Sequence, residues 1–318
     1  MRPTWEELPE TVRQGVEDVL GFAVVRAESQ RGGFSPGVAA RVHGPDGQQA
    51  FVKAASAEIN DVTPGMHRAE ARFTALLPPG HPSPRLLGVL DEGPWVALAL
   101  EAVDGRPPHE PWTEDDLAAA IEVLRLQAAV PAHPTMPPVA ESLAEELLGW
   151  RTLRQERPCL TSWEDRHLDA LAELEPAWET AATGDAWLHL DARGDNMLVR
   201  PDGSAVLVDW PWSARGAAVF DAVGFVPSAV AHGALGVVAG DVHGVPLPAL
   251  GEAAEELFGR FGSAAPADDV TALVCALAGL MQEQMRRPPP PGMPTVRGFQ
   301  AAQGRVACAW LAHRTGWR

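Results

Sequence analysis

The stretch HLDARGDN occupies residues 189–196, and the tripeptide Val-Asp-Trp follows it at 208–210. Between them, a Pro-Asp-Gly turn at 201–203 joins two short apolar runs. This pattern predicts a β-hairpin, because a glycine in such a turn readily adopts a positive φ. The hairpin would bring three polar side chains together at one end: Asp191, Asn196 and Asp209.

Two carboxylates and one amide in this order are typical of a phosphoryl-transfer centre. Such a centre does little covalent work, since it mainly orients a hydroxyl, holds Mg²⁺ on the phosphates and disperses developing charge. Asp191 would face the hydroxyl as the catalytic base, while Asn196 and Asp209 would offer the oxygen ligands that Mg²⁺ prefers. Asp and Asn are also common in ordinary loops. The complete spacing nevertheless favours a metal-dependent site.

A second indication is that the chain contains 24 arginines but only one lysine, Lys53, within an apolar run at 50–54. Lysine carries a compact charge on a flexible stem, whereas arginine presents a planar fork. A cation that must reach an α/β-phosphate from a crowded strand favours the lysine. The alternative is a lysine exposed at the edge of a strand.

With these residues, the chain resembles the aminoglycoside phosphotransferase and choline kinase-like family, small-molecule relatives of the protein kinases. The resemblance covers most of the chain. It implies an α+β, bilobal protein-kinase-like fold. Residues 1–103 would form a small N-terminal lobe with an antiparallel β-sheet and a helix, which binds the nucleotide. Residues 104–318 would form a larger, mainly helical lobe for catalysis and substrate binding, and residues 101–105 the hinge.

The resemblance also places a nucleotide-covering loop at residues 31–37, where Gly33 and Ser35 would lie over the phosphates. This stretch departs from the G-x-G-x-x-G spacing of the protein kinases. A plain hairpin loop would have the same composition. The glycines therefore support the nucleotide site only together with the other motifs.

Glu70 is the expected ion-pair partner of Lys53, because it lies on a segment whose apolar residues have helical spacing. Glu58 is a competing candidate. In the hinge, the resemblance implies that backbone groups of Glu101 and Val103 hydrogen-bond the adenine. Their side chains therefore do not distinguish ATP from GTP.

Two further positions follow from the resemblance. His189 would support the hairpin, and Asp221 would be a structural acid on the next helix. The sequence Asp-Trp-Pro at 209–211 replaces the Asp-Phe-Gly of the protein kinases, and a proline there fixes φ. No Ala-Pro-Glu signature follows. Both departures favour the small-molecule branch over a protein kinase.

Composition is consistent with a two-lobed cytoplasmic enzyme. The chain has 318 residues, of which 46% are hydrophobic, and its three cysteines have no paired spacing. The N-terminal sequence lacks the apolar core of a secretory signal. The uncharged run at 222–240 contains Gly, Pro, Ser and His, so we expect a buried helix and turn and no membrane span.

The formal net charge is −17, with −4 in residues 1–103 and −13 in the remainder. An acidic substrate lobe would attract a cationic acceptor and repel nucleic acid, whose phosphates need a basic surface. A generally acidic, soluble surface would produce the same balance. The charge therefore allows a cationic acceptor without requiring one.

The sequence thus predicts an enzyme that uses Mg²⁺ and ATP, or GTP, to phosphorylate a hydroxyl of a small molecule. A cationic antibiotic such as an aminoglycoside is one acceptor, which would imply antibiotic resistance. A secondary metabolite, a choline-like alcohol or a sugar are others. A catalytically inactive kinase-like binding module is the alternative from another class. The protein would act as a monomer or a homodimer.

Overall fold

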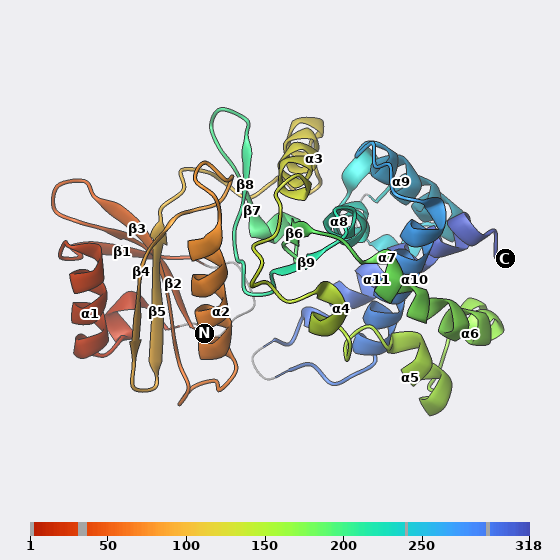
Figure 1. Ribbon diagram of the computed structural model, residues 1–318, viewed down its shortest axis with the longest axis horizontal. Helices are drawn as coiled ribbons and strands as arrows, with labels where there is room; N and C mark the ends of the chain where they lie inside the picture. Colours follow the sequence, from red (N-terminus) through yellow and green to blue (C-terminus); the bar gives the residue numbers. More distant parts are fainter. Residues whose placement is uncertain (1–2, 31–36, 239–240, 291–292) are drawn as a thin grey trace. The chain divides into compact units, whose positions relative to one another are not determined.

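The computed structural model describes residues 3–30, 37–238, 241–290 and 293–318 (Figure 1). The chain forms two compact units. Unit 1 comprises residues 1–107 and 195–212, and unit 2 comprises residues 108–194 and 213–318. Residues 195–212 therefore pack with the N-terminal unit, whereas the sequence placed them with residues 104–318. A boundary drawn along the chain does not reveal that a later segment returns to an earlier unit.

Unit 1 is built on a five-stranded antiparallel sheet with the order β1-β2-β3-β5-β4. Residues on β2 alternate between buried and half-buried, as expected for a strand whose two faces differ. Lys53 pairs with Ala39 on one side and with Leu98 on the other, so it lies in the middle of the sheet and not at its edge. The strands are β1 (Arg26–Ser29), β2 (Val38–His43), β3 (Gln49–Ser56), β4 (Leu86–Glu92) and β5 (Trp95–Glu101).

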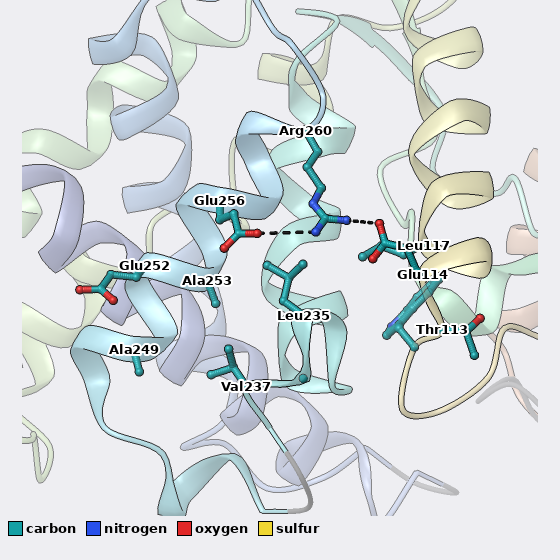
Figure 2. A pocket seen from close by; sticks show the side chains of 12 residues that line it. Thr113, Glu114, Leu117, Leu235, Val237, Ala249, Glu252, Ala253, Glu256 and Arg260 are labelled. Atoms are coloured by element: carbon teal, nitrogen blue, oxygen red, sulfur yellow. Dashed lines mark hydrogen bonds and ion pairs between the residues drawn. The ribbon is translucent and has the colours of Figure 1, made fainter.

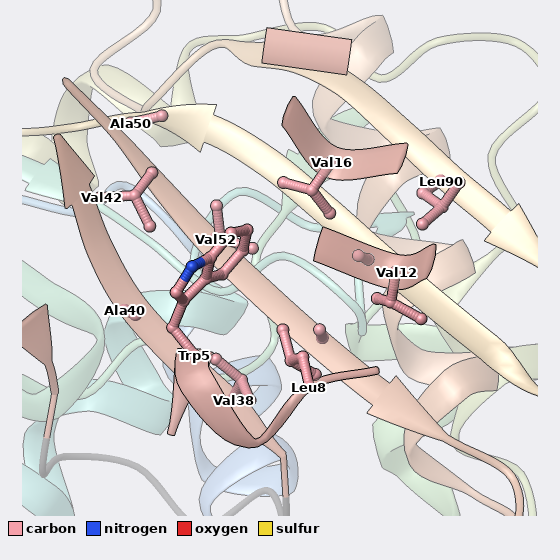
Figure 3. Close-up of a cluster of buried hydrophobic side chains, with 12 residues drawn as sticks. Trp5, Leu8, Val12, Val16, Val38, Ala40, Val42, Ala50, Val52 and Leu90 are labelled. Carbon is pink, nitrogen blue, oxygen red and sulfur yellow. The ribbon is translucent and has the colours of Figure 1, made fainter. Parts of the chain in front are cut away.

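Helices α1 (Glu10–Leu20) and α2 (Thr63–Leu76) lie on opposite faces of this sheet (Figure 1). The α1 face carries a buried apolar cluster, to which the short helix η1 (Trp5–Glu7) contributes its tryptophan (Figure 3). Because side chains alternate along a strand, Val52 belongs to that cluster and its neighbour Lys53 faces α2. The cluster includes Trp5, Leu8, Val12, Val16, Val38, Ala40, Val42, Ala50, Val52 and Leu90.

The predicted hairpin of unit 1 is present. Strands β7 (Met197–Val199) and β8 (Ala205–Leu207) pair antiparallel, and Gly203 in the turn has a φ of +83°. The Val208 N–H donates to the Asn196 carbonyl at 3.0 Å, which extends the hairpin beyond the strands. The short helix η3 (Gly194–Asn196) leads into it.

Unit 2 is mainly helical and includes a small sheet of β6 (Ala186–Leu188) and β9 (Ala214–Gly216). Thr113 caps the first helix of this unit, because its side chain accepts a hydrogen bond from the Asp116 N–H. The helices are α3 (Glu114–Ala128), α4 (Val139–Ser142), α5 (Gly149–Glu156), α6 (Ser162–Leu174), η2 (Glu175–Ala177), α7 (Trp178–Ala181), α8 (Phe220–Ala231), η4 (Ala234–Gly236), η5 (Val242–Gly244), α9 (Leu247–Gly259), α10 (Ala267–Gln284) and α11 (Val296–Thr315).

The core of unit 2 is rich in tryptophan and depends on close helix contacts. Trp150, Trp178, Trp187 and Trp310 are fully buried. Gly149 allows α5 to approach α10, because a Cβ at this position would lie 2.0 Å from the Gly279 carbonyl oxygen. The predicted α+β class is confirmed. No helix within the described part of the chain is both long and apolar enough to cross a membrane.

Candidate active site

Lys53 lies at the centre of a charged triad in unit 1. Its Nζ is 2.7 and 2.8 Å from the two carboxylate oxygens of Glu70 and 3.0 Å from Asp209 Oδ1. Glu70 is on the face of α2 that packs on the sheet, and it is only 2% exposed. Glu58, the competing candidate, is exposed. The structure therefore pairs Lys53 with Glu70.

The triad keeps its lysine positively charged. Burial by itself would lower the pKa of Lys53, but the carboxylates of Glu70 and Asp209 outweigh burial, and the pKa lies above its ordinary value. Burial raises the pKa of Glu70, while Lys53 and the Trp210 N–H oppose this rise. Each charge thus depends on its partners, since an isolated buried charge is costly.

The triad lines a cavity of about 290 Å³ within unit 1. This volume is close to the lower end of the range for small-molecule sites. Phe51, Leu100 and Leu198 provide apolar lining beside the charged groups. Six of the predicted site residues line the cavity: Lys53, Glu70, Glu101, Val103, Asn196 and Asp209. The predicted residues Gly33 and Ser35 lie outside the described residues, and Asp191 belongs to unit 2.

The predicted hinge offers backbone groups at the cavity wall. The Glu101 N–H donates to the Arg85 carbonyl at 2.8 Å, and the Val103 carbonyl accepts a hydrogen bond from Arg41. The Val103 N–H has no hydrogen-bond partner among residues 3–30, 37–238, 241–290 and 293–318. A planar ring in the cavity could therefore accept a hydrogen bond from Val103.

His67 is a cavity residue that the sequence did not indicate. It is 6% exposed and precedes Glu70 by three residues, so the two lie on neighbouring positions of one α2 face. Its Nδ1 is buried without a hydrogen-bond partner in the described structure. Burial, together with the positive charge of Lys53, lowers the pKa of His67 to about 4. The imidazole is therefore neutral at physiological pH, and only its spacing to Glu70 could have indicated its place.

Asp209 has an unusual backbone conformation, with a φ of +69°. Asp adopts this region more readily than most residues. The next residue, Trp210, anchors the segment, because it is 1% exposed and its indole N–H donates to the Leu207 carbonyl at 3.1 Å. The Trp210 ring also makes an edge contact with His81, at 5.2 Å between centroids. Packing of the tryptophan thus holds the carboxylate of Asp209 in place.

In unit 2, the loop at 189–193 is positioned by Asp221. The N–H groups of His189 and Leu190 donate to its two carboxylate oxygens at 2.7 and 2.8 Å. These bonds hold Leu190 at a φ of +65°, which is rare for a branched side chain. Burial raises the pKa of Asp221 to about 6, although both N–H groups oppose the rise. His189 and Asp221, which were both predicted to have structural roles, are thus joined by a hydrogen bond.

Asp191 has an ion-pair partner that the sequence did not indicate. Arg193 Nη1 lies 2.6 Å from Asp191 Oδ1, and the Asp191 N–H donates to His189 Nδ1 at 3.2 Å. The Arg193 guanidinium also lies over the ring of Phe299, 5.1 Å from its centroid. Arg193 therefore holds the carboxylate of Asp191, and His189 holds its backbone N–H.

The oxygen donors of the unit 1 cavity suit a hard cation. Asn196 is 5% exposed, and it lines the cavity together with Asp209. Mg²⁺ is commonly held by one or two protein oxygens together with water and substrate phosphates. The described residues contain no group of three or more His, Cys, Asp or Glu that could hold a metal ion. An Asn–Asp pair fits Mg²⁺ that retains phosphate and water ligands.

Residues 31–253 match the model of the phosphotransferase enzyme family. No curated protein sequence shows a significant match to the chain. Among solved structures, the choline kinase LicA from Streptococcus pneumoniae is 14% identical with a TM-score of 0.58, covering 94% of this chain and 98% of that chain.

A putative fructosamine-3-kinase from Haemophilus somnus 129PT is 13% identical with a TM-score of 0.54, covering 96% of each chain. ADP-bound aminoglycoside phosphotransferase APH(2'')-Ib is 11% identical with a TM-score of 0.53, covering 96% of this chain and 100% of that chain. At these identities the likeness establishes the predicted kinase-like fold. Because the family model spans most of the sequence, the chain belongs to the phosphotransferase enzyme family.

Proposed function

We propose that the protein is a Mg²⁺-dependent kinase that transfers the γ-phosphate of ATP, or of GTP, to a hydroxyl of a small molecule. The observation that carries this proposal is the Lys53–Glu70–Asp209 triad, which lines a single cavity together with Asn196. Phosphoryl transfer needs cations on the phosphates. Lys53 supplies one directly, and the oxygens of Asn196 and Asp209 can hold Mg²⁺ as another.

The unit 1 cavity is the nucleotide site in this proposal. Lys53 contacts the α/β-phosphates, and Glu70 positions it through two hydrogen bonds. The Val103 N–H and the Glu101 carbonyl hydrogen-bond the base, and the segment with Gly33 and Ser35 covers the phosphates. The ADP bound to the aminoglycoside phosphotransferase APH(2'')-Ib supports nucleotide binding in this fold.

Asn196 and Asp209 would hold the metal. When bound, Mg²⁺ neutralises charge on the phosphates. Lys53 already lies 3.0 Å from Asp209 Oδ1, so the lysine fixes the direction of that carboxylate. The positive φ of Asp209 and the buried Trp210 restrict it further. A preorganised carboxylate reduces the reorganisation needed when phosphates bind.

Asp191 is the catalytic base. It orients the acceptor hydroxyl and takes its proton as the hydroxyl oxygen bonds to the γ-phosphorus, while the bond from that phosphorus to the β,γ-bridging oxygen breaks and the nucleoside diphosphate leaves. Arg193 holds one carboxylate oxygen at 2.6 Å, and the His189 N–H, which donates to Asp221, fixes the loop.

The acceptor is a small molecule. A cationic antibiotic such as an aminoglycoside is consistent with the net charge of −17. A choline-like alcohol, a sugar or a secondary metabolite is equally consistent with the fold, since the similar structures include a choline kinase and a putative fructosamine-3-kinase. An aminoglycoside acceptor would give the protein a role in antibiotic resistance.

The proposal is tested by measuring Mg²⁺-dependent consumption of ATP and GTP across aminoglycosides, peptide antibiotics, macrolides, choline and sugars. Acceptor-dependent turnover should fall about 10²- to 10⁴-fold in Asp191→Ala. Asp185→Ala serves as the matched control, because Asp185 is an exposed aspartate of the same unit. An equally active, folded Asp191→Ala protein would refute the assignment of the base. Nucleotide binding without turnover on any acceptor would favour a binding module.

A further inference from the structure

Unit 2 contains a second cavity, of about 480 Å³, between the start of α3, the short helix η4 and α9 (Figure 2). None of the residues proposed for catalysis lines it. The volume is within the range of small-molecule sites. Its lining residues are Trp112, Thr113, Glu114, Leu117, Leu235, Gly236, Val237, Ala249, Glu252, Ala253, Glu256 and Arg260.

One part of the lining is apolar. On α9, Ala249 and Ala253 are four residues apart, so two small side chains on the same helix face leave space there. Leu235 and Val237 lie opposite this face in Figure 2. Leu235 has a φ of +61°, a conformation that costs free energy in a branched residue and is retained only where the surroundings enforce it. The cavity can thus hold an apolar group.

The other part of the lining is acidic. Arg260 Nη1 lies 2.5 Å from Glu114 Oε1, and Nη2 lies 3.5 Å from Glu256 Oε1, so one guanidinium is shared by two carboxylates (Figure 2). Glu252 is a third carboxylate, apart from this pair. Three carboxylates and one guanidinium leave two negative charges on the lining. A cation is favoured there and an anion is repelled.

The cavity is linked to the catalytic loop by Trp112. A Cβ at Gly194 would lie 3.0 Å from Cζ2 of Trp112, so the indole packs directly on the loop three residues after Asp191. Trp112 also makes an edge contact with Phe225, at 5.5 Å between centroids. A ligand that touches the indole is therefore separated from the loop by a single side chain.

We propose that this second cavity binds a small organic cation. Its ammonium group lies among Glu114, Glu252 and Glu256, and its apolar part lies against Leu235 and Val237. Trp112 completes the site, because an indole face attracts cations as well as apolar groups. Such a ligand has two sources: it is either the cationic end of the acceptor or a separate effector that acts on the catalytic loop.

The direct test compares benzylamine with benzyl alcohol by isothermal titration calorimetry, using the full-length protein without nucleotide at neutral pH. The two probes have nearly the same shape, but only benzylamine is charged. We expect saturable binding of benzylamine, tighter than that of benzyl alcohol by about fivefold or more and weakened by added salt. Absence of saturable benzylamine binding, or equal binding of both probes, would overturn the proposal.

Variants locate the site. Glu252→Gln removes one exposed carboxylate without changing its size, and it should weaken benzylamine binding about two- to fivefold. Glu122→Gln is the matched control, because Glu122 is an exposed residue of α3 that does not line the cavity. The control should bind like the unchanged protein. Equal affinities of both variants would place the amine elsewhere and overturn the proposal.

A further arm distinguishes the two sources. Benzylamine has no hydroxyl and cannot itself be phosphorylated. If the cavity holds the cationic end of the acceptor, benzylamine will raise KM for a cationic acceptor without changing kcat. If it holds an effector, benzylamine will change kcat with a neutral acceptor. Because binding is measured without nucleotide, the site stands or falls independently of the proposed kinase activity.

Discussion

The two cavities differ in how their charges are balanced. In unit 1, Lys53 and Glu70 are 16% and 2% exposed in their side chains, and the lysine meets two carboxylates within 3.0 Å. In unit 2, Glu114 and Arg260 are 72% and 32% exposed, and Glu252 is exposed as well. Buried charges must be matched, because desolvation is costly, whereas exposed ones are screened by water. The first arrangement is therefore rigid, and the second can accept a new partner.

Lys53→Ala should have the largest effect. It leaves Glu70 buried without its cation, which we expect to cost about 3 to 5 kcal/mol in the free energy of unfolding. Turnover should fall by more than about 10²-fold, because the phosphate contact is lost as well. Urea denaturation and steady-state kinetics measure the two effects. Unchanged stability would mean that the triad is not the buried, matched arrangement described above.

Glu70→Gln should have a smaller effect on stability, about 2 to 3 kcal/mol, because Lys53 keeps its contact with Asp209. Nucleotide affinity, measured by calorimetry, should also decrease, since the lysine is no longer held from α2. Glu58→Gln is the control and should behave like the unchanged protein. If Glu58→Gln were the more damaging change, the choice between the two glutamates would be wrong.

His67 makes the stability of unit 1 depend on pH. Its pKa is lowered from 6.5 to about 4, so the unfolded chain binds a proton more readily than the folded one between these values. The contribution of neutral His67 to the free energy of unfolding is fully present above pH 6.5. It is lost as the pH falls towards 4, and the total loss is at most about 3 kcal/mol.

The measurement is urea unfolding at several pH values in the unchanged protein and in His67→Gln. The difference between the two stability curves isolates the contribution of His67, because Asp221 titrates in both proteins. Asp221 affects the pH dependence of stability in the opposite direction. With its pKa raised to about 6, Asp221 favours the folded state at low pH, and this contribution is lost as the pH rises through 6. Parallel curves for both proteins would show that His67 is not buried in its neutral form.

Arg260→Gln should have the smallest effect on stability, less than about 1 kcal/mol, because its partner Glu114 is mostly exposed. Removing the guanidinium also makes the lining of the second cavity more negative, so benzylamine should bind more tightly. Thermal denaturation and calorimetry test these two outcomes. A loss of stability similar to that of Lys53→Ala would remove the contrast between the cavities.

Local patterns along the chain predicted much of unit 1. The Pro-Asp-Gly turn between apolar runs predicted the hairpin, because a turn signal acts over a few residues. The position of Lys53 in an apolar run and the helical spacing around Glu70 made this contact the expected one, with Glu58 left as a competing candidate. Unlike these, the roles assigned to Asp191, Asn196 and Asp209 are predictions that the proposed kinetics will test.

Contacts between distant segments could not be predicted in this way. Nothing near His67 in the sequence shows that its Nδ1 is buried without a partner in the described structure, and nothing near Arg193 shows that its guanidinium lies over the ring of Phe299. Both facts depend on which elements meet. The second cavity likewise depends on α3, η4 and α9, whose lining residues extend along the chain from Trp112 to Arg260.

The order of chemical groups in the sequence was therefore sufficient for the fold class, the family and the hairpin, because turns, caps and strand periodicity depend on neighbouring residues. Packing alone determined that residues 195–212 join unit 1, that Glu70 rather than Glu58 faces Lys53, and that α9 leaves a cavity beside α3. Burial and charge pairing depend on segments far apart in the chain, and these properties are set only when the whole chain has folded.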